Sequence, residues 1–298
     1  LPKFMMPYKA LTNVRIISNI ELSAKGATPM KQHLIVLDLD GTLLTSKQTI
    51  SPYTESILMK AKDAGHEVMI ATGRPYRASQ QYYKQLHLTT PIVNFNGAYI
   101  HHPLVTSWNH IHTPISMEVV NDVVHSIHKY EYENLIAEIK DDVYLHKDDR
   151  SLMKILGNGN PMIVAGNLSE TLPDNPTSLL IHAEEEKVST IRDHLQDVHA
   201  ELIEHRRWGA PFSVVEVVRK GLNKAVGIDY IARQMGVPRD RIIAFGDEDN
   251  DLEMIDYAGV GVVMGNGIDQ LKSIANEVTL SNNEDGIGHF LADRLSLK

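Results

Sequence analysis

The sequence predicts an α/β protein: a Rossmann-like, doubly wound parallel sheet with an α+β domain inserted into it. Short apolar runs alternate with helical stretches over about residues 33–97 and again over 223–295, as in parallel strands joined by crossover helices. Between about 113 and 214 this alternation gives way to a block long enough to fold as a domain. We therefore expect a core at 30–112 and 215–298, an inserted domain at 113–214, and an N-terminal extension of open status at 1–29.

The first part of the chain predicts three strands separated by two helices. Gly65 suits the end of the first helix, because glycine accepts the left-handed conformation that often follows a helix. Pro75 suits the first turn of the second helix, where a missing N–H costs nothing. The expected elements are strand 33–38, helix 53–64, strand 67–71, helix 76–87 and strand 92–95.

The inserted block predicts helices and strands in a different order, and the regular alternation then returns. Its expected elements are helix 116–129, strands 134–139 and 142–146, a helix near 149–156, strand 178–182, helix 184–197, and strands 201–206 and 212–218. The last part predicts helix 223–235, strand 241–245, a helix from Asn250, strand 260–264 and two closing helical stretches.

Charge and composition exclude several classes of protein. The 298 residues include 29 Lys and Arg against 38 Asp and Glu, a formal charge of −9, whereas nucleic-acid binders usually need a basic field. There is no cysteine, which excludes thiolate chemistry and fits a reducing compartment. No apolar run approaches the roughly 18 residues that a membrane span needs. We expect a cytoplasmic monomer or weak homo-oligomer with neither nucleic-acid nor membrane partners.

Asp38 and Asp40 follow the first predicted strand. In an extended segment residues two apart point to the same side, so both carboxylates can face one reacting centre. Gly41 lets the chain turn sharply, and the N–H groups of such a turn can bind an anion. An ordinary turn after a strand is the alternative, since Asp, Gly and Thr are common there.

A second acidic turn, residues 246–251, follows a later strand and contains Asp247, Asn250 and Asp251. Carboxylate oxygens held near two further carboxylates suit Mg²⁺. Acidic residues are also favoured at helix N-termini, but that preference does not explain why this turn lies opposite a second acidic turn. We expect Glu248 and Asp249 to face solvent.

Thr72, Gly73 and Lys224 are candidate phosphate contacts. A hydroxyl and a backbone N–H just before a helix suit a phosphate, although Thr-Gly is also an ordinary helix cap. Lys224 can offset phosphate charge or hold a nucleophile. A lone lysine is more often a surface residue, so Lys224 is a candidate only because of its context in the sequence.

Taken together and in order, these residues resemble the haloacid dehalogenase-like phosphohydrolase superfamily, and within it the Cof-type sugar-phosphatase branch. The resemblance covers about residues 33–295, with a large insertion where this branch carries its cap domain. The matching segments are Asp38-x-Asp40-Gly41-Thr42, Ala71-Thr72-Gly73-Arg74, Lys224, Gly246-Asp247-x-x-Asn250-Asp251, and the secondary signatures 94–98 and 283–286.

The resemblance implies a role for each matching residue. Asp38 is implied as the nucleophile that forms an aspartyl-phosphate, and Asp40 as the general acid and base. The implied Mg²⁺ ligands are Asp38, the Asp40 backbone carbonyl, Asp247 and Asp251, and the implied phosphate contacts are Thr72, Gly73, Lys224 and Asn250. The role of Arg74 stays open.

The expected function is a Mg²⁺-dependent phosphomonoester hydrolase for a small phosphorylated metabolite, either a sugar phosphate or a phosphorylated cofactor. Two alternatives remain. A phosphomutase or phosphotransferase would use the same nucleophile with a hydroxyl acceptor, and a non-catalytic regulator would bind the metabolite without turnover.

Two further groups carry weaker expectations. His101, His102, His110 and His112 fit no metal spacing and are expected as exposed loop residues. Arg206, Arg207 and Trp208 are either substrate contacts of the cap or a surface turn.

Overall fold

A computed structural model describes residues 32–156, 159–208 and 213–297. The predicted extension at 1–29 lies outside the described residues, which belong to one compact unit, Gln32–Lys298. In the part of the chain that the structure describes, no helix is both long and apolar enough to cross a membrane. The compartment and the oligomeric state stay predictions.

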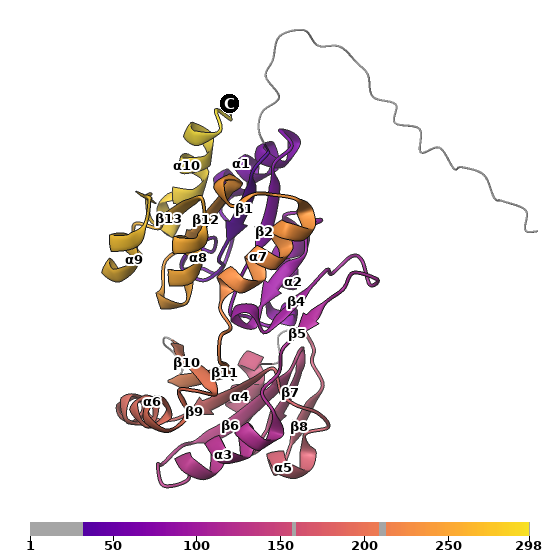
Figure 1. The fold of residues 1–298 in the computed structure, drawn as a ribbon, viewed down its shortest axis with the longest axis vertical. Coiled ribbons are helices and arrows are strands. Elements are labelled where there is room, and N and C mark those ends of the chain that lie inside the picture. The colour runs from indigo at the N-terminus through magenta and orange to yellow at the C-terminus, as the bar shows by residue number, and fades with distance from the viewer. Residues whose placement is uncertain (1–31, 157–158, 209–212, 298) are drawn as a thin grey trace, which may run out of the picture. The chain divides into compact units, whose positions relative to one another are not determined.

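The core is a five-stranded sheet in the order β14-β13-β12-β1-β2, with every pairing parallel. Its central strand β1 (Leu34–Leu37) lies between β12 (Ile242–Gly246) and β2 (Glu67–Ile70), although β12 comes some two hundred residues later in the chain (Figure 1). The outer strands are β13 (Val260–Val263) and β14 (Glu277–Val278).

Helices cover both faces of this sheet, which confirms the doubly wound fold. Ile35 and Leu37 of β1 pack in one apolar cluster with α1 (Pro52–Asp63), α2 (Tyr76–Gln85) and α10 (Gly286–Arg294). Leu34 and Val36 pack in another, because side chains alternate along a strand. The helices on that second face are α7 (Lys224–Met235), α8 (Leu252–Tyr257) and α9 (Asp269–Ile274).

The predicted strand at 92–95 ends earlier than expected. In the described part of the chain, one isolated bridge, from Val93 to Ala71, pairs β3 (Ile92–Asn94) with the core sheet. A tight turn, η1 (Phe95–Gly97), reverses the chain, so that β3 pairs antiparallel with β4 (Tyr99–His101), which pairs with β5 (Ile111–His112). β4 and β5 are not among the elements that the sequence predicts.

The inserted block forms a separate six-stranded sheet in the order β10-β11-β9-β6-β7-β8. α3 (Met117–Ile127) and α6 (Glu185–His199) pack on one face, and α4 (Arg150–Leu156) packs on the other. The strands are β6 (Asn134–Ile139), β7 (Asp142–Leu145), β8 (Ile163–Ala165), β9 (Ser178–His182), β10 (Ile203–Trp208) and β11 (Val214–Arg219).

Most predicted elements of this block form within a few residues of their expected limits. β8 and the short helix α5 (Leu168–Thr171) were not predicted. β11 continues to Arg219, so the second sheet extends past the predicted boundary at 214, and the division into domains stays a prediction.

Arg77, at the start of α2, joins the core to the second sheet. Its Nη2 forms a buried ion pair with Glu138 of β6, and its Nε donates to the carbonyl of Leu156 at 3.0 Å. The Arg77 backbone N–H also donates to Asp141 Oδ1 at 2.7 Å. A buried charge needs such partners, so these contacts hold the Arg77 side chain against the second sheet.

Candidate active site

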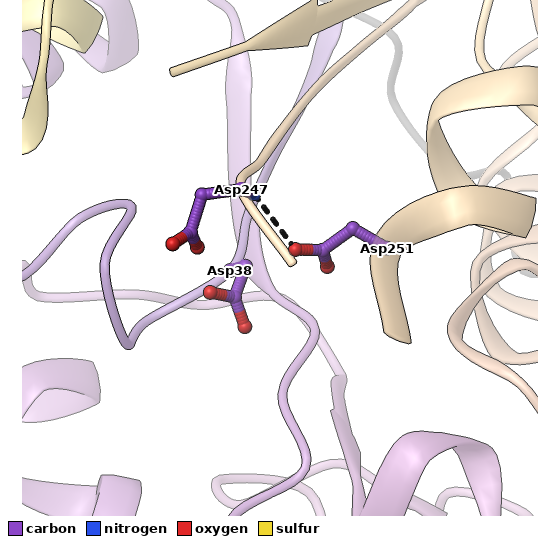
Figure 2. A group of neighbouring side chains, drawn as sticks. All are labelled: Asp38, Asp247 and Asp251. Atoms are coloured by element: carbon purple, nitrogen blue, oxygen red, sulfur yellow. Dashed lines mark hydrogen bonds between the residues drawn. The ribbon is translucent and has the colours of Figure 1, made fainter. Parts of the chain in front are cut away.

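Two acidic turns meet at the carboxyl edge of the core sheet. Asp38 follows β1 and Asp247 follows β12, and these strands are parallel neighbours, so both turns leave the same edge. Asp38, Asp247 and Asp251 each offer a carboxylate oxygen, and these oxygens lie within 4.8 Å of one another. Figure 2 shows the three carboxylates gathered from separate segments of the chain.

Lys224, at the N-terminus of α7, is fully buried beside this cluster. Its Nζ lies 2.6 Å from Asp38 Oδ1 and 2.6 Å from Asp251 Oδ1. Burial lowers the pKa of Lys224, but Asp251 and Asp38 outweigh it, so that the net shift is upward and the ammonium form is stabilised. The lysine is therefore part of the site and not a surface residue.

The cluster keeps more negative than positive charge. Three carboxylates against one ammonium leave a formal surplus of two negative charges. Burial raises the pKa of Asp38 well above its usual range, and burial together with Asp251 raises the pKa of Asp247 to about 7. Because the carboxylates are hard oxygen ligands in mutual repulsion, the site suits a divalent cation.

Neighbouring groups fix the orientation of the Asp247 and Asp251 carboxylates. Asp251 Oδ2 accepts from the backbone N–H groups of Asp247 at 2.9 Å and Glu248 at 3.2 Å, and so closes the acidic turn. Asp247 accepts from Thr42 Oγ1 at 2.8 Å and from Asn266 Nδ2 at 3.3 Å. Asn266 was missed by the sequence analysis.

Asp40 lies outside the three-carboxylate group. Its side chain is 52% exposed and forms a two-pronged ion pair with Arg74, with Arg74 Nε 2.6 Å from Asp40 Oδ2. The pair assigns a partner to Arg74, whose role the sequence left open. The implied metal contact through the Asp40 backbone carbonyl stays a prediction.

The four candidate phosphate contacts come together in space, three of them around Asn96. Thr72 is buried and its backbone carbonyl accepts from the Asn96 N–H at 3.2 Å. A Cβ on Gly73 would lie 3.1 Å from Asn96 Nδ2, and Asn250 Nδ2 donates to Asn96 Oδ1 at 3.1 Å. Lys224 lies at the same edge of the core sheet, where its Nζ donates to Asp38. The sequence placed Asn96 at the end of a strand, in a polar cluster expected at the ligand edge of the sheet, but assigned it no contact.

Gly41→Ala should disturb the acidic cluster directly. Gly41 has φ +74°, and a Cβ there would lie 2.0 Å from Asp247 Oδ2, so alanine must displace that carboxylate. We expect a loss of at least about tenfold in kcat/KM and weaker cation binding.

Gly65→Ala is the matched control for Gly41→Ala. Gly65 has φ +90° but nothing within 4 Å of a Cβ. Both variants should lower Tm through backbone strain, whereas only Gly41→Ala should lose activity. Equal activity in the two variants would contradict the proposed importance of the Asp247 position.

The remaining expectations have mixed outcomes. Glu248 is exposed as expected, but Asp249 is half-buried. The histidines do not form a metal group within the described ranges, yet the expectation that all four are exposed is wrong, since His101 is buried in β4 and burial lowers its pKa to about 4. The segment 206–208 belongs to strand β10 and not to a surface turn, and its side chains lie outside the described residues.

Comparison with known proteins identifies the family. The sequence profile of haloacid dehalogenase-like hydrolases matches residues 35–291, most of the chain. The chain belongs to the haloacid dehalogenase-like hydrolase family. Within this family it is a phosphatase, as the resemblance in the sequence implied.

Individual relatives agree in sequence and in fold. The chain is 53% identical over 267 residues to the 5-amino-6-(5-phospho-D-ribitylamino)uracil phosphatase YitU of Bacillus subtilis, covering 90% of this chain and 99% of that one. It is 28% identical to the pyridoxal phosphate phosphatase YbhA of Escherichia coli, over 89% and 100% of the two chains. A haloacid dehalogenase-like hydrolase from Bacteroides thetaiotaomicron has a similar structure, with a TM-score of 0.75, 26% identity and coverage of 89% and 100%.

Proposed function

We propose that this chain is a Mg²⁺-dependent phosphatase that hydrolyses 5-amino-6-(5-phospho-D-ribitylamino)uracil through an aspartyl-phosphate on Asp38. The observation that carries the proposal is its 53% identity, over nearly the full length of both chains, to a phosphatase named for that substrate. The substrate is a small phosphomonoester, as the sequence analysis expected.

The acidic cluster supports a divalent cation as the cofactor. Asp38, Asp247 and Asp251 would hold it, and their surplus of negative charge matches the charge that it brings. When bound, Mg²⁺ would neutralise charge on the phosphoryl group and on the carboxylates around it. The same neutralisation would let a dianionic phosphate enter an acidic protein.

Asp38 and Asp40 would divide the chemistry between them. An Asp38 oxygen forms a bond to phosphorus while the bond from phosphorus to the ribityl oxygen breaks, and Asp40 gives a proton to the leaving alkoxide. Asp40 then takes a proton from the water that attacks phosphorus, which frees Asp38 and inorganic phosphate. Asp40 is paired with Arg74 as a carboxylate, so to act as the acid it would have to leave this ion pair and take up a proton first.

Lys224 and the residues around Asn96 would hold the reacting groups. The Lys224 ammonium is bonded to Asp38, where it orients that carboxyl group and opposes the rise that burial causes in its pKa. Thr72, the Gly73 N–H and Asn250 would donate to the phosphoryl oxygens, where fixed donors stabilise charge that develops during transfer.

The proposed substrate is tested by phosphate release from a panel of phosphomonoesters. We expect kcat/KM for 5-amino-6-(5-phospho-D-ribitylamino)uracil to exceed that for pyridoxal phosphate and simple sugar phosphates by at least about tenfold. A preference for any other member of the panel would contradict the proposed substrate. Phosphate transfer to an added alcohol or sugar, in place of release, would favour the phosphotransferase alternative.

Metal dependence is a separate prediction. Activity should be lost in excess chelator and restored by Mg²⁺, with Ca²⁺ a poor substitute because it prefers more ligands at longer distances. Mg²⁺ should also raise Tm, and more at pH 8 than at pH 5, since protons compete with the cation for the carboxylates. Full activity in chelator, or the same Tm with and without Mg²⁺, would contradict the prediction.

A further inference from the structure

Asn96 occupies a strained and buried position between the core and the second sheet. The consecutive residues Phe95, Asn96 and Gly97 have φ of 51°, 51° and 101°, although only glycine adopts such values freely. Asn96 is 2% exposed. Positive φ at two successive non-glycine residues costs free energy, and such strain persists where the surrounding structure imposes it, often at functional sites.

The Asn96 side chain forms hydrogen bonds with one residue of the core and with one residue of the second sheet. Its Oδ1 accepts from Asn250 Nδ2 at 3.1 Å, and its Nδ2 donates to Glu216 Oε2 at 3.3 Å. Glu216 lies on β11 of the second sheet, is 2% exposed, and interrupts an otherwise apolar segment, Val214–Val218. A buried carboxylate needs hydrogen-bond partners, and the Asn96 amide is one of those of Glu216.

Glu216 fixes which way the Asn96 amide faces. An ionised carboxylate only accepts hydrogen bonds, so it selects the NH₂ end of the amide and turns the carbonyl end toward Asn250. The Asn250 nitrogen carries two N–H groups. One goes to Asn96, and the other is the one that would reach a phosphoryl oxygen.

We propose that Glu216 is a positioning residue for the phosphoryl pocket, which acts from the second sheet through Asn96 to orient the Asn250 amide. The proposal rests on the proposed function, because it takes Asn250 as a phosphate contact. A residue that recognises the leaving group affects some substrates and not others. A positioning residue for the phosphoryl pocket, as proposed for Glu216, affects all substrates. It also links the inserted domain to phosphate binding itself.

Glu216→Gln is the direct test, because glutamine can donate as well as accept and so permits the Asn96 amide to turn over. We expect the inhibition constant of inorganic phosphate to rise about five- to tenfold, and kcat/KM to fall by the same factor for the ribityl substrate and for p-nitrophenyl phosphate. Glu216→Asp, which keeps an acceptor-only group, should recover part of the loss. If Glu216→Gln does not fold, Asn96→Ala tests the same link, and the inhibition constant of inorganic phosphate should rise by a similar factor in that variant.

A double-mutant cycle with Asn96→Ala shows whether Glu216 acts through Asn96. Adding Glu216→Gln to Asn96→Ala should cause no further loss, because the link is already broken. Glu138→Gln is the matched control, since Glu138 is the other fully buried glutamate of this sheet but pairs with Arg77. In the double variant, the falls in kcat/KM caused by Glu138→Gln and by Asn96→Ala should multiply.

Two outcomes would overturn the proposal. The first is a loss confined to the ribityl substrate, which would make Glu216 a contact of the leaving group. The second is a cycle in which the losses from Glu216→Gln and Asn96→Ala multiply. The measurements with p-nitrophenyl phosphate and inorganic phosphate do not need the ribityl substrate, so failure of the proposed substrate is distinguishable from failure of this inference.

Discussion

Asp38→Asn should lower kcat by about a thousandfold or more, because an amide is a poor nucleophile and a weak ligand for a cation. Asp38 is 4% exposed, lies at the end of the central strand and is bonded to Lys224. No other described carboxylate follows β1 into the cluster, so no neighbour takes over its position without movement of the main chain.

The fold should survive this substitution. Asparagine is nearly the same size, and its neutral side chain removes one of three carboxylates that repel one another. The checks are phosphate release under saturating Mg²⁺, Tm, and mass spectrometry for a phosphoryl adduct during turnover. Retention of about a tenth of wild-type kcat in a folded variant would disprove the assignment of the nucleophile.

Arg77→Met should have the largest effect on stability, a loss of about 3–5 kcal/mol in the free energy of unfolding. The arginine is 8% exposed and Glu138 is fully buried, so the substitution leaves a carboxylate without its counter-charge in the interior. The Ser178 hydroxyl, which donates to Glu138 at 3.1 Å, does not replace a positive charge.

Denaturant unfolding of two matched variants isolates this effect. Arg233→Met removes an ion pair with Asp229 in which the arginine is 78% exposed, and should cost less than about 1 kcal/mol. Arg77→Met combined with Glu138→Leu should recover much of the loss, because an apolar pair of similar volume can replace a buried ion pair. Equal losses for Arg77→Met and Arg233→Met would show that the buried pair contributes little.

The sequence by itself determined the architecture of the core and the edge of the sheet at which most of the candidate site residues lie. Alternating apolar strands and helices indicate a parallel sheet, and parallel strands end at one edge, so the sequence alone predicts that Asp38 and Asp247 lie together. These inferences succeed because they depend on local periodicity and on turns, which neighbouring residues in the chain decide.

Tertiary structure decided which side chains touch. Thr42 and Asp247 are 205 positions apart, and only the pairing of β1 with β12 brings their side chains within 2.8 Å. Lys224 was expected at the site only from its context in the sequence, whereas its burial and its contacts with two carboxylates are decided by packing.

The same reason explains why the contacts of Asn96, the role of Glu216 and the burial of His101 were not predicted, although Asn96 itself was expected at the ligand edge. Asn96, Glu216 and His101 all lie where the chain reverses or where one sheet meets another, and a pattern along one segment carries no information about the segment packed against it. Glu216 is a single charge in an apolar strand, and its meaning depends on Asn96, 120 positions earlier in the chain. Local sequence determines on which face of a strand or helix a side chain lies. Packing between distant segments determines which residues contact that face.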